Sequence, residues 1–230
     1  MCFFFAGAGG PLPAPAVAEA RAGVGEVAYT LATAIKGEMS ESFVLLYSEV
    51  ARTLEPANAD AAIFSAELYE AIGRYDLATR AYDSVAPDDP AFLAAEIGRA
   101  DALRKSGMAE EAVAVLQGLA GTHPHLAVIQ ANLGDALRAL EDWPAAEVAY
   151  GKAIDLSPEG ASGLWLMYYS RGVMRHRSDN WAGAEADLRA ALDVRPDHPN
   201  VLNYLGYSLV ERGEKRPEAL AMIERAVALE

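Results

Sequence analysis

The chain has 230 residues, with 33 Asp or Glu against 19 Lys or Arg, so its formal net charge is −14. A surface of this sign repels the phosphate backbone of nucleic acids, so we expect no nucleic-acid partner. Cys2 is the only cysteine, which excludes an internal disulfide. No apolar run reaches the ~20 residues that a spanning helix needs, so no transmembrane segment is predicted.

Residues 1–22 differ from the rest of the chain and form a leader. A short apolar run from Cys2 to Ala8 precedes clustered Gly and Pro, and Ala16-Val17-Ala18 has the small-x-small form of a signal-peptidase site. No Lys or Arg precedes the apolar run. One interpretation is the end of an export signal, which predicts a periplasmic or envelope-associated protein. The other is a disordered leader on a cytoplasmic protein.

The remaining sequence, 23–230, repeats with a period of about 34 residues. An alanine recurs with steps of 34, 34, 38 and 35 residues at Ala78, Ala112, Ala146, Ala184 and Ala219. A proline recurs with steps of 34, 34, 34 and 38 residues at Pro56, Pro90, Pro124, Pro158 and Pro196. Two independent markers with one period predict six helix–turn–helix repeats, at about 25–58, 59–92, 93–126, 127–160, 165–198 and 199–230.

The first three repeats follow this plan with small departures. In the first repeat Val44 replaces the alanine and Ser48 replaces a large residue, and Ser40 or Ser42 is the expected cap of the second helix. In the second and third repeats, Gly73 and Gly107 are expected to make the turn between the two helices.

The fourth repeat shows the pattern most completely. Gly134 and Ala146 are small at the positions where the two helices should cross closely, and Tyr150 is large where neighbouring helices need filling. Asp142 is the expected N-cap of the second helix, with Pro144 in the first turn of that helix.

The last two repeats depart from the period. Four extra residues lie between Pro158 and Trp165, so either the first helix of the fifth repeat is longer or the connection bulges. Pro217 is expected to begin the last helix. No helix with a polar outer face follows, so the chain is expected to be part of a longer array or to pair with a partner through this uncapped end.

The order of small and large residues in these hairpins resembles the tetratricopeptide repeat (TPR). The resemblance covers nearly the whole repeat region and implies an all-α, right-handed superhelical solenoid of about six hairpins. In that family the first helices of successive hairpins line a concave groove that binds proteins or peptides. The sixth repeat, VLNYLGYSLVERGEKRPEALAMIERAVALE, is similar to segments of proteobacterial envelope TPR adaptors.

The family's contact positions in the first helices select the candidate site. An acidic row beside a basic row includes Asp101 with Arg104 and Asp135 with Arg138, which are either ligand contacts or simple i,i+3 pairs. Aromatic and amide residues follow, and they are either contact residues or inter-repeat packing. The candidate groove residues are Asp101, Arg104, Asn132, Asp135, Arg138, Tyr169, Asn203, Tyr204 and Tyr207.

The sequence contains no arrangement of residues that indicates catalysis. His123 and His125 flank Pro124 at a repeat boundary, where a solvated turn is expected rather than a metal site. We therefore predict no enzyme, no cofactor and no metal. The residues with which some TPR arrays clamp C-terminal carboxylates are also missing.

The predicted function is a protein- or peptide-binding scaffold or adaptor, in a bacterial envelope assembly or in delivery of substrates to a protease. The alternatives are a regulatory or substrate-binding arm of a longer enzyme, or a cytoplasmic scaffold.

Overall fold

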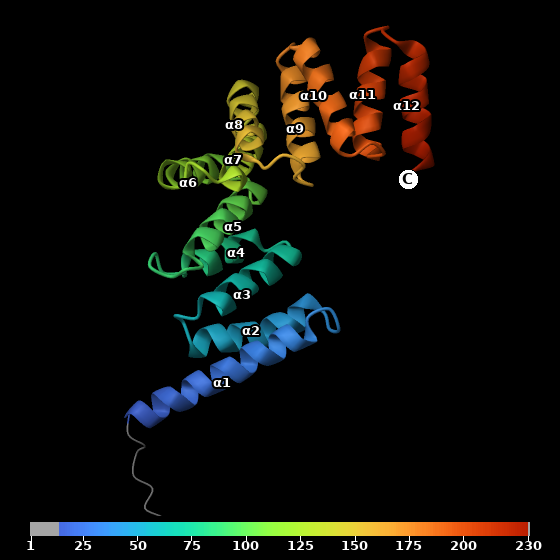
Figure 1. The fold of residues 1–230 in the computed structure, drawn as a ribbon. Helices are drawn as coiled ribbons and strands as arrows, with labels where there is room; N and C mark the ends of the chain where they lie inside the picture. Colours follow the sequence, from blue (N-terminus) through green and yellow to red (C-terminus); the bar gives the residue numbers. More distant parts are fainter. Residues whose placement is uncertain (1–13, 230) are drawn as a thin grey trace, which may run out of the picture. The chain divides into compact units, whose positions relative to one another are not determined.

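A computed structural model describes residues 14–229, and these residues form twelve α-helices and no β-strand (Figure 1). The helices are α1 (Ala14–Ile35), α2 (Glu41–Leu54), α3 (Ala59–Ala71), α4 (Tyr75–Asp83), α5 (Phe92–Lys105), α6 (Ala109–Thr122), α7 (Ala127–Ala139), α8 (Trp143–Leu156), α9 (Leu164–Arg177), α10 (Trp181–Val194), α11 (Pro199–Glu211) and α12 (Arg216–Ala228). Each expected repeat holds two consecutive helices. The predicted all-α repeat fold is confirmed.

The first helix begins earlier than the sequence analysis expected. Residues 14–22, assigned above to the leader, belong to α1, so a disordered leader is wrong for this part of the chain. Alanine is the strongest helix former, and Pro15 lies in the first turn, where a proline displaces no helical hydrogen bond. The apolar run from Cys2 to Ala8 lies outside the described residues.

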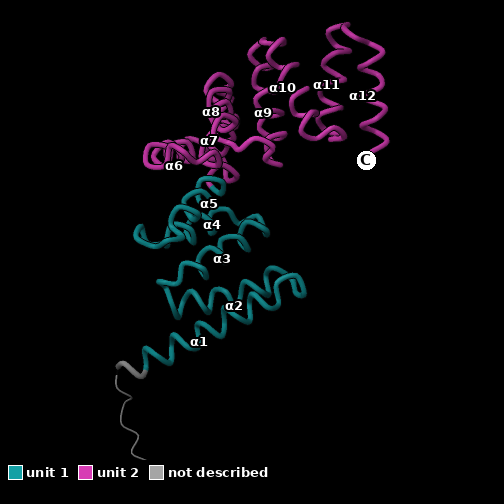
Figure 2. Tube along the Cα trace, viewed as in Figure 1, with its two compact units in different colours: residues 1–102 teal, residues 103–230 magenta. Residues whose placement is uncertain are grey.

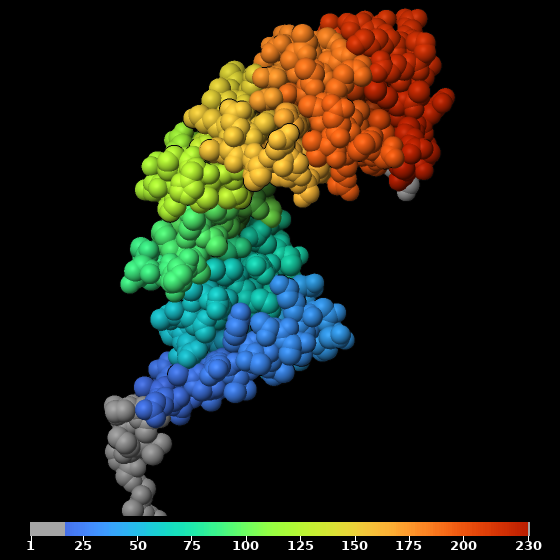
Figure 3. All heavy atoms as spheres, viewed as in Figure 1, coloured from blue at the N-terminus to red at the C-terminus, as the bar shows by residue number. Residues whose placement is uncertain are grey.

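The chain divides into two compact units, residues 1–102 and 103–230, and the boundary falls within α5 (Figure 2). The first unit therefore contains α1 to α4, and the second contains α6 to α12. Within each unit, side chains fill the gaps that the ribbons leave between successive helices (Figure 3).

The recurring alanines of the second helices are completely buried. The relative exposure is 0% for each of Ala78, Ala112, Ala146, Ala184 and Ala219. A larger side chain at such a position would push two closely packed helices apart. The period of the sequence is therefore a period of close helix contacts.

In the first unit, a hydroxyl pair takes the place of a large residue. Ser48 on α2 and Ser65 on α3 are both 0% exposed, and their Oγ atoms lie 2.7 Å apart in a hydrogen bond. Burial of a hydroxyl without a partner is unfavourable, and the two serines satisfy each other. This contact accounts for the departure of the first repeat from the pattern. Val44, at the alanine position, is 1% exposed.

In the second unit, glycines of the first helices make room for large residues of the second helices. A Cβ built at Gly134 would lie 2.7 Å from Cε1 of Tyr150, and one at Gly206 would lie 2.8 Å from Cγ1 of Ile223. Both distances are shorter than side chains tolerate. The close crossing predicted around Gly134 is thus present.

The helix ends follow the predictions with one exception. Asp142 caps α8 by accepting a hydrogen bond from the backbone N–H of Ala145, with Pro144 in the first turn. Gly73 and Gly107 occupy their turns with φ of +73° and +87°, a conformation that glycine adopts freely. The exception is partial: Ser40 is the N-cap residue of α2, one of the two predicted alternatives, but its side chain forms no capping hydrogen bond.

Most of the extra length of the fifth repeat lies in the connection before its first helix, which is itself only one residue longer than α7. Residues 157–163 join α8 to α9, and Gly160 turns the chain with φ of +75°. Pro217 lies in the first turn of α12, as predicted. Within residues 14–229, no helix combines the length and the apolar character that a membrane crossing requires.

Candidate functional site

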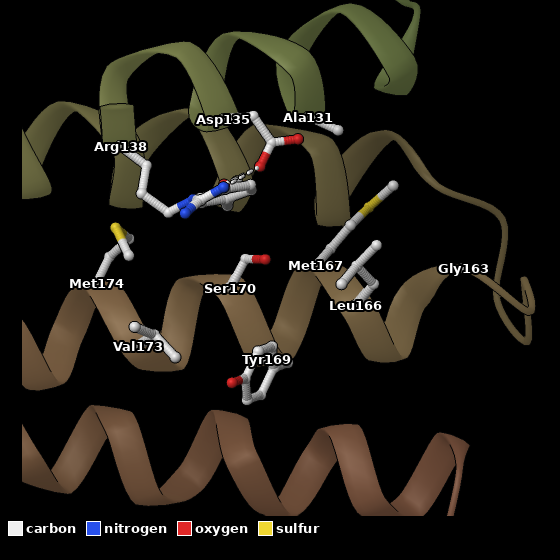
Figure 4. Close-up of a pocket in the computed structure, with 11 residues that line it drawn as sticks. Ala131, Asp135, Arg138, Gly163, Leu166, Met167, Tyr169, Ser170, Val173 and Met174 are labelled. Carbon is white, nitrogen blue, oxygen red and sulfur yellow. Dashed lines mark hydrogen bonds and ion pairs between the residues drawn. The ribbon is translucent and has the colours of Figure 1, made fainter. Parts of the chain in front are cut away.

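The second unit has a hollow of about 420 Å³ between α7 and α9, which we call the first hollow (Figure 4). Most of its wall is apolar and comes from α9. Leu166 is 51% exposed, so part of this apolar surface faces solvent. The lining residues are Ala131, Asp135, Arg138, Tyr150, Gly163, Leu166, Met167, Tyr169, Ser170, Val173 and Met174.

Asp135, Arg138 and Tyr150 form a polar cluster on the side of the first hollow that α7 and α8 supply. The hydroxyl of Tyr150 donates to Oδ1 of Asp135 over 2.8 Å. Nη2 of Arg138 lies 3.5 Å from the same oxygen of Asp135 (Figure 4). Burial, and then the charge of Asp135, raise the pKa of Tyr150, so this hydroxyl stays protonated and keeps donating. Asp135 and Arg138 therefore form the i,i+3 pair that was one of the two interpretations, and they also line the hollow.

A second hollow, of about 470 Å³, lies between α9 and α11 and is more polar. The phenol of Tyr207 is well exposed, at 54%. The lining residues of this second hollow are His176, Arg177, Asn203, Tyr204, Tyr207, Ser208 and Glu211.

Two tyrosines connect the hollows. Tyr169 lines the first and Tyr204 lines the second, and their rings meet edge to face with centroids 5.8 Å apart. The hydroxyl of Tyr204 is 3.0 Å from Nδ1 of His176. Burial raises the pKa of both tyrosines. The two hollows thus adjoin along the first helices of the fourth, fifth and sixth repeats.

A buried ion network fixes α9, which contributes to both hollows. Arg171 makes two hydrogen bonds to Asp187 on α10, of 2.7 and 2.8 Å. Arg175 donates to Asp187 over 2.9 Å and to Glu147 on α8 over 2.8 Å. Asp187 is only 3% exposed, so one buried carboxylate holds two arginines of α9 in place.

The structure brings six of the nine candidate residues into these hollows and leaves three outside. Asp135, Arg138 and Tyr169 line the first, and Asn203, Tyr204 and Tyr207 line the second. The amide of Asn132 donates instead to the carbonyl of Val128, one turn earlier on its own helix, over 2.8 Å. Asp101 and Arg104 lie on α5 and line neither hollow.

Several lining residues were not among the candidates. Leu166, Ser170 and Val173 share one face of α9 with Tyr169, as their spacing of three and four residues allows. That spacing was visible in the sequence, whereas the position of Met167 and Met174 relative to α7 was not.

Comparisons with known proteins agree with this architecture. No protein-family model matches the chain. Over 151 residues it is 30% identical to the TPR repeat-containing protein PA4667 of Pseudomonas aeruginosa, a match that covers 64% of this chain and 25% of that protein. The chain therefore spans about a quarter of the length of this relative.

Solved structures resemble the fold over most of its length. PilF of Pseudomonas aeruginosa matches with a TM-score of 0.68 and 16% identity, covering 88% of this chain and 90% of PilF. YrrB, described as a TPR protein with an unusual peptide-binding site, matches with a TM-score of 0.58 and 18% identity, covering 76% of this chain and 88% of YrrB. At these identities the similarity establishes the fold alone.

The repeated hairpins, the buried small residues and the site on the first helices define an all-α repeat protein. The chain has the fold of a tetratricopeptide-repeat array.

Proposed function

We propose that this chain is a protein-binding scaffold, and that it holds an extended segment of its partner against α7, α9 and α11. The observation that carries the proposal is the continuity of the two hollows through Tyr169 and Tyr204. An extended segment needs such a continuous surface, with apolar area for its side chains and a few polar groups for its backbone. YrrB, a TPR protein with a similar fold, has a peptide-binding site, which supports the proposal.

Exposed apolar and aromatic side chains supply the binding energy in this proposal. Tyr207 and Leu166 are about half exposed, at 54% and 51%, and neither belongs to the buried core. Tyrosine is enriched among residues that dominate binding, because it buries a large area with few torsions to fix. Tyr204 is a less suitable probe, since it also packs against the core cluster around Leu205.

A display library of random linear peptides, selected on the immobilised chain, tests the proposal. Peptides should be enriched, and Tyr207→Ala should weaken their binding by about 2 kcal/mol, or roughly 30-fold in Kd. Leu166→Ala should also weaken binding. The matched control is Leu220→Ala, because Leu220 is 55% exposed on α12 and lines neither hollow.

Two results would contradict the proposal. One is a library that yields no binder. The other is a set of binders whose affinity falls equally with Leu220→Ala and with the two hollow variants.

The finer role within this proposal is that of an adaptor in a bacterial envelope, which delivers or assembles the proteins it binds. The similarity of the sixth repeat to envelope TPR adaptors and the signal-like residues 1–20 support it. Fusion of the chain to a reporter enzyme that is active only after export would test the location. We expect the fusion to be active and to lose this activity when residues 1–20 are deleted. A fusion that is inactive from the start would favour a cytoplasmic scaffold. That the chain is not an enzyme remains a prediction.

A further inference from the structure

Building on the proposed function, we infer that the partner segment is recognised at two points. A large apolar side chain enters the first hollow, and a side-chain carboxylate of Asp or Glu, a few residues away, binds Arg177 in the second. The partner is thus a segment with an apolar anchor and an acidic residue.

The first hollow suits an apolar anchor because the charged groups in its wall already pair with each other. Asp135 accepts from the hydroxyl of Tyr150 and pairs with Arg138. The rest of the wall includes Leu166, Met167, Val173 and Met174, and Met side chains adapt to the shape of a guest. A volume of about 420 Å³ falls within the roughly 300–1,000 Å³ typical of binding pockets.

Arg177 is the arginine of α9 whose charge no carboxylate of the described residues neutralises. Of the three arginines on α9, Arg171 and Arg175 form ion pairs with Asp187. Arg177 forms no ion pair with any residue in the described part of the chain. Its guanidinium lies over the ring of Trp143, 5.8 Å from the centroid, and is exposed. A guanidinium in this setting can still bind a carboxylate through two parallel hydrogen bonds.

The other groups of the second hollow also favour an acceptor. The amide of Asn203 is exposed and can donate beside Arg177, as can the hydroxyl of Tyr207. Glu211 is the one carboxylate among the described residues that line this hollow, and it opposes an acidic guest. The opposite signs of Arg177 and Glu211 make the inference testable, because an acidic and a basic guest respond to the two residues in opposite directions.

The spacing of the two points follows from the helices. The hollows lie on opposite sides of α9, so their separation is on the order of one helix-to-helix distance, about 10 Å. An extended chain advances about 3.3 Å per residue. The acidic residue should therefore lie about three or four positions from the apolar anchor.

The experiment uses peptides enriched from the display library, synthesised with an amidated C-terminus so that only side-chain carboxylates remain. We expect the enriched sequences to share a large apolar residue and an Asp or Glu at this spacing. Arg177→Gln should weaken their binding about tenfold or more, and Glu211→Gln should strengthen it. Replacing the peptide's acidic residue by its amide should weaken binding to the wild-type chain but change little with Arg177→Gln. The matched control is Arg225→Gln, because Arg225 lies on α12 outside both hollows.

The possible failures are distinguishable. If peptides bind and depend on Tyr207 but share no carboxylate, the inference is wrong and the proposed function stands. If Arg177→Gln strengthens binding and Glu211→Gln weakens it, the second hollow takes a basic residue. If amidation alone abolishes binding, the carboxylate is a chain terminus and the inference is wrong. If no peptide is enriched, the inference fails together with the proposed function.

Discussion

Gly134 on α7 leaves the space that the ring of Tyr150 on α8 occupies. A Cβ at position 134 would lie 2.7 to 2.9 Å from three carbons of that ring, and Tyr150 is 2% exposed, so the ring has little room to move. The same ring carries the hydroxyl that binds Asp135 in the first hollow. Helix packing and the geometry of the candidate site are therefore coupled at this glycine.

Gly134→Ala should destabilise the protein because overpacking outweighs helix propensity. Alanine favours a helix over glycine by about 1 kcal/mol, but forcing a side chain into a filled site costs about 1–3 kcal/mol. Denaturant unfolding would measure the net loss. Gly118→Ala on α6 is the control, since nothing lies within 4 Å of a Cβ at that position, and it should stabilise slightly. Equal effects at the two positions would contradict the packing described here.

Asp187→Ala should be among the most destabilising single changes in the second unit. It removes the carboxylate that holds Arg171 and Arg175, and it leaves both guanidinium groups partly buried without that partner. Breaking a buried ion pair in this way costs about 3 kcal/mol or more. Asp197→Ala, which breaks the exposed pair between Asp197 and Arg225, should leave the unfolding midpoint almost unchanged. A small effect at Asp187 would show that the network is dispensable.

The contribution of Glu185 to stability should decrease in acid. A hydrogen bond from Lys215, together with pairing to Arg189, lowers the pKa of Glu185 below its ordinary value of 4.5. A carboxyl whose pKa is lowered by folding stabilises the folded protein at pH values above its unfolded-state pKa. This stabilisation is lost as the pH falls through the folded-state pKa. The difference in unfolding free energy between wild type and Glu185→Gln should therefore be largest near neutral pH and shrink below about pH 4.5.

The control for this pH series is Glu224→Gln, because Glu224 is exposed and forms no ion pair with any residue that the structure describes. It should show no comparable dependence. A Glu185 difference that grows in acid would contradict the assigned pairing.

Deletion of residues 1–20 should change the thermal stability little, although α1 begins at Ala14. Residues 17–20 are exposed, and from residue 17 onward the first buried position of α1 is Gly25, which lies against the side chain of Glu55. Shortening an exposed helix end removes almost no buried apolar area. A fall in Tm of roughly 10 °C would correspond to a loss of several kcal/mol and would show that this segment packs on the fold.

The sequence predicted the repeat architecture well because helix crossings leave a periodic trace. Only a very small residue fits where two helices touch, so Ala146 and its equivalents are conspicuous at a fixed spacing. Gly134 and Ala146 were assigned to one close crossing; Ala146 is completely buried in the structure, and the side chain that faces Gly134 is Tyr150. The start of α1 was missed because the Gly and Pro residues before it outweighed its alanines in the pattern.

The candidate site was less predictable, because each of its polar side chains has several hydrogen-bond partners within reach in the folded structure. The hydroxyl of Tyr150 reaches Asp135, and the amide of Asn132 turns back to its own helix. Neither hydrogen bond can be inferred from the spacing of residues in the sequence. Position in the repeat identified the face of each helix, but not which polar groups on that face were already engaged.

The connection at 157–163 explains how the array tolerates a change of length. The alanine spacing increases from 34 to 38 residues across it, yet Ala184 is as buried as its equivalents, at 0% exposure. Most of the added length is absorbed between hairpins, where no crossing has to be kept in register. In evolutionary terms, such joints let insertions accumulate and whole hairpins be duplicated or lost, while a deletion inside a hairpin disrupts two helices at once.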